Sequence, residues 1–186
     1  RDVLMFGDKS LEIYYNSGAS DFPFARQGNA FIERGCFDRD SIASMDNTVY
    51  FVGDDRLAYM LDGYNPVIIS TPDEARHLAN ATFARAFVYE KEGHKFWCLR
   101  LDDISLSYDA STQRWHQRQS YLQDTWRING ACVAYGQTVF SDAQSGLLYT
   151  ISNDVFTENG VAILMDIYLP TIEAMRERAV MYSFEL

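Results

Sequence analysis

Cysteine is scarce in this 186-residue chain, and its three copies follow no spacing that would mark a chemical site. Cys36, Cys98 and Cys132 form neither the even set of a disulfide framework nor the closely spaced pairs of a structural metal site. Each lies in or beside an apolar stretch, where a reduced thiol packs as a small hydrophobic side chain. We therefore predict buried, reduced cysteines and synthesis in a reducing cytoplasm.

Catalytic and metal-binding motifs are also missing. The histidines His77, His94 and His116 are 17 and 22 residues apart, which fits no zinc-ligand spacing. The sequence has no nucleophile elbow of the form G-x-S-x-G and no glycine-rich phosphate loop. It therefore predicts no catalytic residue, no metal and no cofactor.

Lysine is the third scarce residue, with only Lys9, Lys91 and Lys95 among 16 cationic side chains and a net charge of −10. A DNA-binding surface needs cations along the phosphate backbone, so the acidic balance argues against nucleic acid as a partner. The remaining cations are arginines, which protein–protein contacts favour over lysine. The composition is compatible with an assembly component, and equally with a bias in codon usage.

No apolar run approaches the roughly 20 residues of a membrane-spanning helix, and no secretory leader is present, so we predict no membrane partner. The chain opens at Arg1-Asp2-Val3 without an initiator methionine and ends inside an apolar stretch. We expect residues 1–186 to be a single domain or an internal fragment of a larger protein.

The chain does contain a repeated strand–turn–strand motif. Four tyrosines, Tyr14, Tyr59, Tyr108 and Tyr149, hold a comparable late position in it and are 45, 49 and 41 residues apart. A period of that length fits about four short strands, which form one blade of a β-propeller. Because 15% of the residues are aromatic, half-buried strands are also favoured by composition. The fold predicted for 1–186 is an all-β, propeller-like array of antiparallel blades, as a complete ring or part of one.

Apolar runs separated by Gly and Asp turns place the individual strands. The predicted strands cover residues 3–6, 11–15, 48–52, 56–60, 67–70, 84–90, 95–101, 104–108, 115–119, 130–135, 138–141, 146–151 and 178–184. One short helix is predicted over residues 72–79, with Thr71 as its cap and Pro72 at its first position.

Two acidic pairs, Asp54-Asp55 and Asp102-Asp103, are the obvious carboxylates to consider for glycoside hydrolysis. Adjacent residues on a strand point to opposite faces, so neither pair can supply both catalytic carboxylates by itself. Both pairs lie at predicted turns, where Asp is favoured for local hydrogen bonding. We interpret them as turn residues.

A series of short motifs carries a family resemblance. These motifs, over residues 4–78 in this order, are Phe6-Gly7, Ser10-Leu11-Glu12, Asp21-Phe22-Pro23-Phe24, Ile32-Glu33-Arg34-Gly35-Cys36, Asp46-Asn47-Thr48-Val49-Tyr50, Gly53-Asp54-Asp55-Arg56, Asp62-Gly63-Tyr64 and Pro66 to Thr71. The series resembles the packaged-DNA stabilisation protein of short-tailed phages, also called the tail accessory factor or tail hub. From about residue 80 onward, only the blade period continues the resemblance.

The resemblance implies a structural virion protein rather than an enzyme. Proteins of this family bind below the portal protein or a portal-bound adaptor ring in six copies, close the channel and retain the packaged DNA. They also form the platform for the tail needle and tailspikes. Because interfaces are enriched in arginine, Arg26, Arg34, Arg39 and Arg56 are the candidate protein-contact residues.

Two other functions fit a propeller. One is a polysaccharide-degrading enzyme, which would need two carboxylates converging on a cleft, one of them with a raised pKa. The other is a glycan-binding tail protein, which would need an aromatic platform in every blade. Trp97, Trp115 and Trp126 do not follow the repeat, which argues against the second alternative.

Overall fold

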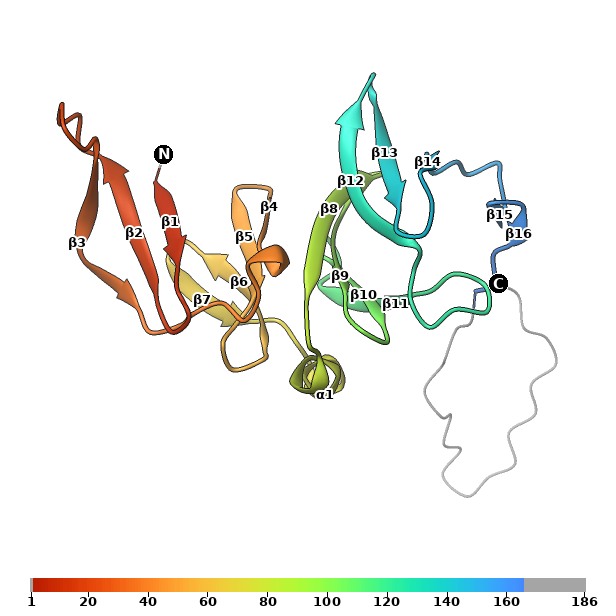
Figure 1. Ribbon diagram of the computed structural model, residues 1–186, viewed down its shortest axis with the longest axis horizontal. Coiled ribbons are helices and arrows are strands. Elements are labelled where there is room, and N and C mark those ends of the chain that lie inside the picture. The colour runs from red at the N-terminus through yellow and green to blue at the C-terminus, as the bar shows by residue number, and fades with distance from the viewer. Residues whose placement is uncertain (1, 166–186) are drawn as a thin grey trace, which may run out of the picture.

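Four small antiparallel sheets follow one another along the chain and stand in a row (Figure 1). This arrangement is seen in a computed structural model that describes residues 2–165. The second sheet and the third sheet each have four strands in sequence order, and the first and fourth have three. The predicted array of antiparallel blades is thereby confirmed, and within the described range the row stays open.

Each sheet is built from consecutive strands. Sheet 1 contains β1 (Val3–Phe6), β2 (Leu11–Asn16) and β3 (Phe24–Ile32). Sheet 2 contains β4 (Ala43–Met45), β5 (Thr48–Val52), β6 (Ala58–Asp62) and β7 (Asn65–Ile68). Sheet 3 contains β8 (Arg85–Lys91), β9 (His94–Arg100), β10 (Ser105–Asp109) and β11 (Arg114–Arg118). Sheet 4 contains β12 (Ile128–Ala134), β13 (Gln137–Asp142) and β14 (Leu148–Tyr149), and a small hairpin follows, β15 (Thr157–Glu158) with β16 (Val161–Ala162).

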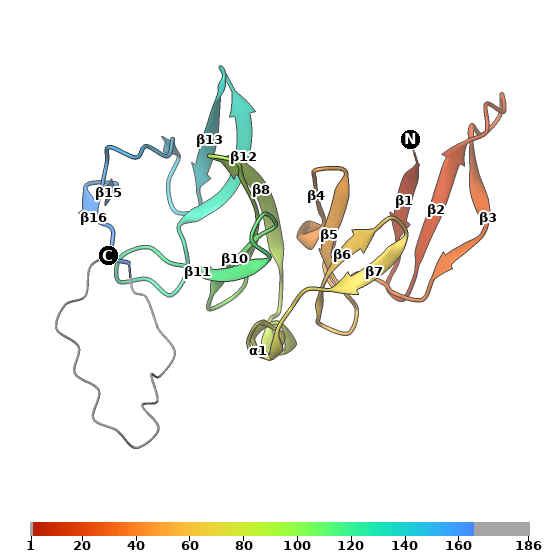
Figure 2. The same cartoon turned by 180° about the vertical axis from the view of Figure 1, so that it is seen from behind.

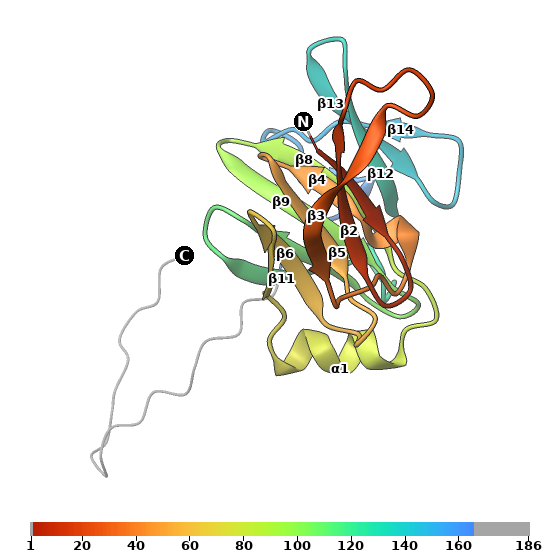
Figure 3. The same cartoon turned by 90° about the vertical axis from the view of Figure 1, so that its left-hand side faces the viewer.

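The first strands of sheets 2 to 4 lie next to one another, because β4 contacts β8 and β8 contacts β12. The sheets therefore fan out from one side, with their faces packed together, as propeller blades do. Seen from behind, the row keeps the same order (Figure 2), and seen from its end the sheets stack one behind another (Figure 3).

The repeated tyrosines explain how the sheets pack. Tyr59, Tyr108 and Tyr149 each lie on the third strand of a sheet, directly opposite a buried aromatic residue on the second strand. Those partners are, in chain order, Phe51, Trp97 and Phe140. Each pair packs against the preceding sheet: Phe51 contacts Phe6, Trp97 contacts Tyr50, and Phe140 contacts Tyr89, with ring centroids 4.9, 5.6 and 5.1 Å apart. The spacing of the tyrosines therefore marks the interval at which each sheet packs against the preceding one.

Tyr14 occupies the corresponding place in sheet 1, opposite Val3, but no described sheet precedes it. It lies on the opposite side of β2 from the buried residues Leu11 and Ile13, and it is only half-buried. Its register suggests that β1, β2 and β3 correspond to the second, third and fourth strands of a complete blade.

Sheet 3 is covered on both faces, and its strands alternate between two cores. Trp97 and Leu99 on β9 contribute to the core shared with sheet 2, whereas Cys98 contributes to the core shared with sheet 4. All five residues of β10 are buried as a result. A strand buried on both faces loses the clean apolar–polar alternation of a surface strand. The prediction of buried cysteines is confirmed for Cys98, but it is wrong for Cys132, which is exposed, and Cys36 is only half-buried.

The predicted helix is confirmed as α1 (Pro72–Asn80), with Leu78 buried against the core of sheets 2 and 3. Thr71 accepts a hydrogen bond from the Asp73 amide, and Glu74 reaches back to the Thr71 amide, which completes a capping box. Such local signals are visible in the sequence. A short 3₁₀ turn, η1 (Arg39–Ser41), precedes sheet 2.

The observed bounds of some strands differ from the predicted ones. β7 begins at Asn65 rather than 67, so Pro66 lies inside it, opposite Leu61. Proline is tolerated there because β7 is an edge strand, where one row of amides makes no ladder hydrogen bond. β14 is shorter than the predicted 146–151, and the predicted strand 178–184 lies outside the described residues. No helix within residues 2–165 is long and apolar enough to cross a membrane.

Candidate functional site

Carboxylates in or beside the loops between the second and third strands join sheets 2, 3 and 4 to the chain segments that enter them. In sheet 2 this loop carries Asp54, whose carboxylate accepts hydrogen bonds from the Gly35 amide at 3.1 Å and from Arg34 at 3.2 Å. Lys9, from the equivalent loop of sheet 1, pairs with the same carboxylate at 3.1 Å. Gly35 passes so close to sheet 1 that a Cβ there would lie 2.1 Å from the Asp8 carbonyl oxygen. Asp54 therefore connects sheets 1 and 2.

Asp102 performs the corresponding task in sheet 3. Its carboxylate accepts a hydrogen bond from the Thr82 amide at 2.6 Å and a second one from the Thr82 hydroxyl. Thr82 follows α1 in the connection that leads into β8. The carboxylate therefore fixes the end of the helical connection to the sheet that it enters.

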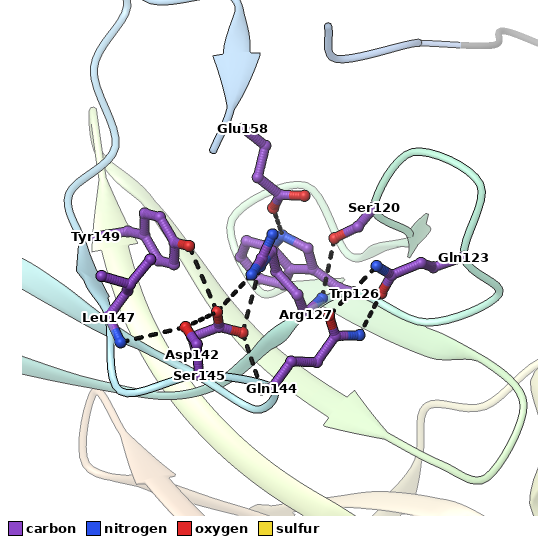
Figure 4. Close-up of polar contacts among 10 residues, drawn as sticks. All are labelled: Ser120, Gln123, Trp126, Arg127, Asp142, Gln144, Ser145, Leu147, Tyr149 and Glu158. Carbon is purple, nitrogen blue, oxygen red and sulfur yellow. Dashed lines mark hydrogen bonds and ion pairs between the residues drawn. The ribbon is translucent and has the colours of Figure 1, made fainter. Parts of the chain in front are cut away.

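Asp142 is the third member, and it forms the most enclosed polar cluster of the molecule's described part (Figure 4). Its carboxylate is fully buried and pairs with the largely buried Arg127 at 2.5 Å. The Gln144 amide, the Ser145 hydroxyl and the Tyr149 hydroxyl donate to the same carboxylate. Arg127 lies immediately before β12, so this ion pair again joins a loop to the entering segment.

Neighbouring polar groups hold Arg127 in place. Its amide donates to the Ser120 hydroxyl at 3.0 Å, and its guanidinium lies 5.5 Å from the centre of the Tyr149 ring. The Trp126 indole N–H donates to Glu158 at 2.9 Å, which ties the β15–β16 hairpin to the cluster. The arrangement is a structural junction among three segments (Figure 4).

The electrostatics of these carboxylates favour the ionised form. Hydrogen bonds from Arg127 hold the pKa of Asp142 well below its usual range, and those from Thr82 lower the pKa of Asp102. Burial alone would raise the pKa of Asp54, but hydrogen bonds from Lys9, Gly35 and Arg34 outweigh it and lower the pKa. A general acid for glycoside hydrolysis needs the opposite shift. The interpretation of Asp54 and Asp102 as turn residues agrees with these contacts.

Low pH should therefore destabilise the fold. A carboxylate whose pKa is lower in the folded state than in the unfolded chain contributes stability above the unfolded value of about 3.9, and that stability is lost as the pH falls. We expect the free energy of unfolding to decrease from about pH 5 toward pH 2. Urea unfolding across this range measures it. The Asp142→Asn variant should show a shallower decrease, and an identical slope would contradict the assignment.

Two of the predicted arginines have internal partners. Arg34 pairs with Asp55 at 2.9 Å and with Asp54, and it lies over the Tyr59 ring. Arg56 donates to the Ala81 carbonyl at 2.5 Å and stacks on Phe37. Both side chains thus hold loops together inside the molecule.

The other two predicted arginines are more accessible. The Arg39 side chain, in η1, is 93% exposed, and Arg26 on β3 is 43% exposed beside Glu12 and Phe31. Arg26 lies on β3 of sheet 1, whereas Arg39 lies in η1 before sheet 2, so the structure does not bring the four arginines into one cluster. The contact role of all four stays a prediction.

The aromatic and histidine candidates are also engaged in packing. Trp97 is fully buried, and Trp115 donates to the Ile69 carbonyl at 2.7 Å, so neither presents an open platform for a sugar ring. His94 pairs with the buried Asp109 at 2.7 Å at the turn after β10. No group of three or more potential metal ligands occurs among residues 2–165.

Exposed apolar residues at two hairpin ends were missed by sequence reasoning. Phe22 and Phe24 pack edge-on at the β2–β3 loop and are 58% and 36% exposed. Val133 and Tyr135, at the end of the β12–β13 hairpin, are 81% and 101% exposed. Both ends point to the same edge of the row (Figure 1). Only the arrangement of strands shows that these residues face solvent, because apolar residues beside a turn otherwise read as core.

Comparison with known proteins settles the family. No curated protein matches the chain. The family model described as bacteriophage P22 Gp10, beta-propeller, matches residues 1–156, which include all four sheets. With the row of antiparallel blades and its repeated aromatic pairs, this match shows that the chain belongs to the phage P22 Gp10 family of packaged-DNA stabilisation proteins, which are β-propellers.

Proposed function

We propose that this phage structural protein is part of the virion's head-to-tail connector, where it closes the portal channel and retains the packaged DNA. The family match over residues 1–156 is the observation that carries the proposal. In this role six copies bind below the portal protein or a portal-bound adaptor ring. They are made in the host cytoplasm and provide the platform for the tail needle and tailspikes.

The charge of the protein supports closure by protein contacts. With a net charge of −10, the chain repels the DNA phosphates rather than binding them. A plug of this kind holds DNA by blocking its path, and its affinity must come from contacts with the surrounding protein ring. The exposed aromatic hairpin ends are suited to such contacts, since interface cores are enriched in aromatic residues.

The proposal is tested by mixing the full-length protein with purified portal rings and measuring the mass of the complex by native mass spectrometry. We expect six added copies per portal assembly. Rings carrying the adaptor should be measured in parallel, because either ring is a possible receptor. Absence of binding to both rings would refute the connector role.

Charge reversal of the accessible arginines should weaken that binding. We expect Arg26→Glu and Arg39→Glu each to raise the dissociation constant about tenfold or more, as loss of an interface arginine commonly does. Titration of labelled protein against portal rings provides the measurement. Arg114→Glu, at an exposed arginine on β11, is the matched control and should bind normally. Unchanged binding by both test variants would show that neither arginine contacts the ring.

A further inference from the structure

A polar pocket of about 380 Å³ lies where the segments that enter sheets 2, 3 and 4 come together. It is lined by Arg85 at the start of β8, Arg100 at the end of β9 and Asn129 near the start of β12. Asp38 and Asp40, from the η1 segment, also line it. None of these five residues belongs to the carboxylate junctions of the three sheets.

The two arginines of this pocket place like charges side by side. Arg85 and Arg100 are directly opposite each other on the antiparallel strands β8 and β9. Phe87 and Cys98, two residues further along each strand, pack into the core shared with sheet 4, so both arginines lie on that face of sheet 3. Like charges directly opposite each other on a sheet are destabilising. The pair therefore requires negative charge nearby.

The described part of the chain supplies that charge to Arg85 but not to Arg100. Asp40 lies 3.6 Å from Arg85. Arg100 forms no ion pair with a carboxylate of residues 2–165, and its Nη1 atom is buried without a hydrogen-bond partner there. Asp38 does not fill this gap, because its two oxygens accept hydrogen bonds from the amides of Asp40 and Ala84, each at 3.0 Å. Arg100 is therefore a charged donor that lacks an acceptor.

A carboxylate is the ligand that this arrangement fits. A guanidinium presents parallel N–H donors that match the two oxygens of a carboxylate. Phe83, which is 38% exposed, borders the pocket and provides an apolar surface for the methylene groups of an acidic side chain. Nucleic acid fits poorly, because phosphate backbones are held by rows of cations, whereas Asp38 and Asp40 border this single concave site.

We propose that the pocket is a carboxylate-binding site, in which Arg100 and Arg85 hold the side chain of a glutamate or aspartate from a partner protein. The bound carboxylate supplies the acceptor that Arg100 lacks and offsets the repulsion between the two arginines. The Arg85 side chain is 48% exposed, so the pocket is open to such a partner. Arginine in a partly enclosed site of this kind often carries much of the binding energy of a protein interface.

Binding of a peptide to the full-length protein tests the proposal. The probe is an acetylated and amidated tripeptide with a central glutamate, and its binding is measured by saturation-transfer NMR, which detects dissociation constants in the millimolar range. We expect the same peptide with a central glutamine to bind at least about fivefold more weakly, because it lacks the charge that pairs with arginine. Inorganic phosphate and free succinate are measured as competitors. Either anion binding more tightly than the glutamate peptide would overturn a protein carboxylate as the ligand.

Variants of the pocket assign the binding to its residues. We expect Arg100→Gln to weaken binding of the glutamate peptide at least about tenfold, since hydrogen bonds between charged groups are lost. Arg76→Gln, at an arginine of α1 that is 70% exposed and does not line the pocket, is the matched control and should bind normally.

Asp40→Asn provides a result that misfolding cannot produce. This variant removes the carboxylate that competes for Arg85, so we expect the glutamate peptide to bind about threefold more tightly. Equal binding of the two peptides, unchanged binding by Arg100→Gln, or weaker binding by Asp40→Asn would each overturn the proposal. The measurement requires no portal ring, so its failure would leave the connector role standing.

Discussion

Replacing Trp97 with alanine is expected to lower the free energy of unfolding by about 3–5 kcal/mol. The indole is fully buried between sheets 2 and 3, with its ring centroid 5.6 Å from that of Tyr50 and 5.9 Å from that of Trp115. Its removal leaves a cavity that β5 and β10 cannot fill without shifting the sheets. Since small domains are stable by only about 5–15 kcal/mol, this single loss would remove much of the total. Urea unfolding followed by circular dichroism measures it.

Trp97→Phe is the matched control for the loss of ring volume. The indole N–H of Trp97 has no hydrogen-bond partner within the described part of the chain, so a phenyl ring sacrifices no polar contact there. We expect it to cost well under half as much as alanine. If both variants lost similar stability, the packing of Trp97 would not be what joins sheets 2 and 3.

Removal of the buried carboxylate of Asp142 should produce the second large effect. Asp142→Ala leaves the Arg127 guanidinium in a largely buried site without its counter-ion, and breaking such a pair typically costs about 3–5 kcal/mol. We expect a value near the lower end, about 3 kcal/mol, because the overlying residues Gln144 and Ser145 are exposed and water can reach the arginine after a small movement. The measurement is again urea unfolding, at neutral pH.

A double-mutant cycle measures the interaction free energy between Arg127 and Asp142 separately from their contacts with other residues. Arg127→Leu combined with Asp142→Leu should be more stable than the sum of the two single losses predicts, because neither charge is then left alone. Asp124→Ala, at a nearby exposed carboxylate, should change stability by less than about 0.5 kcal/mol. Additive losses in the cycle would mean that Asp142 and Arg127 act independently.

Local signals and regularly repeated ones could be recognised in the sequence. The Thr71, Pro72 and Glu74 combination predicts the start of α1, and the four spaced tyrosines predict the blade period. Both depend on the local backbone or on the repeated register of neighbouring strands. The strands of the hairpins could be predicted from the sequence for the same reason.

The polar junctions could not be predicted in the same way. Asp102 and Thr82 are 20 residues apart, and Asp142 and Arg127 are 15 apart, so their contacts exist only after the sheets have formed. The sequence identifies Asp102 as a turn residue but not its partner. Likewise, Arg34 and Arg56 look like any surface arginine until the Asp54–Asp55 loop and the end of α1 are placed beside them.

The division of sheet 3 between two cores limits how this chain can change in length. Neighbouring residues of β9 belong to different interfaces, so inserting one residue there would exchange the side chains delivered to sheets 2 and 4. Both interfaces would then be lost together. Natural variants of this protein should therefore gain or lose residues in the connections between strands, or by whole blades, while the central strands keep their length.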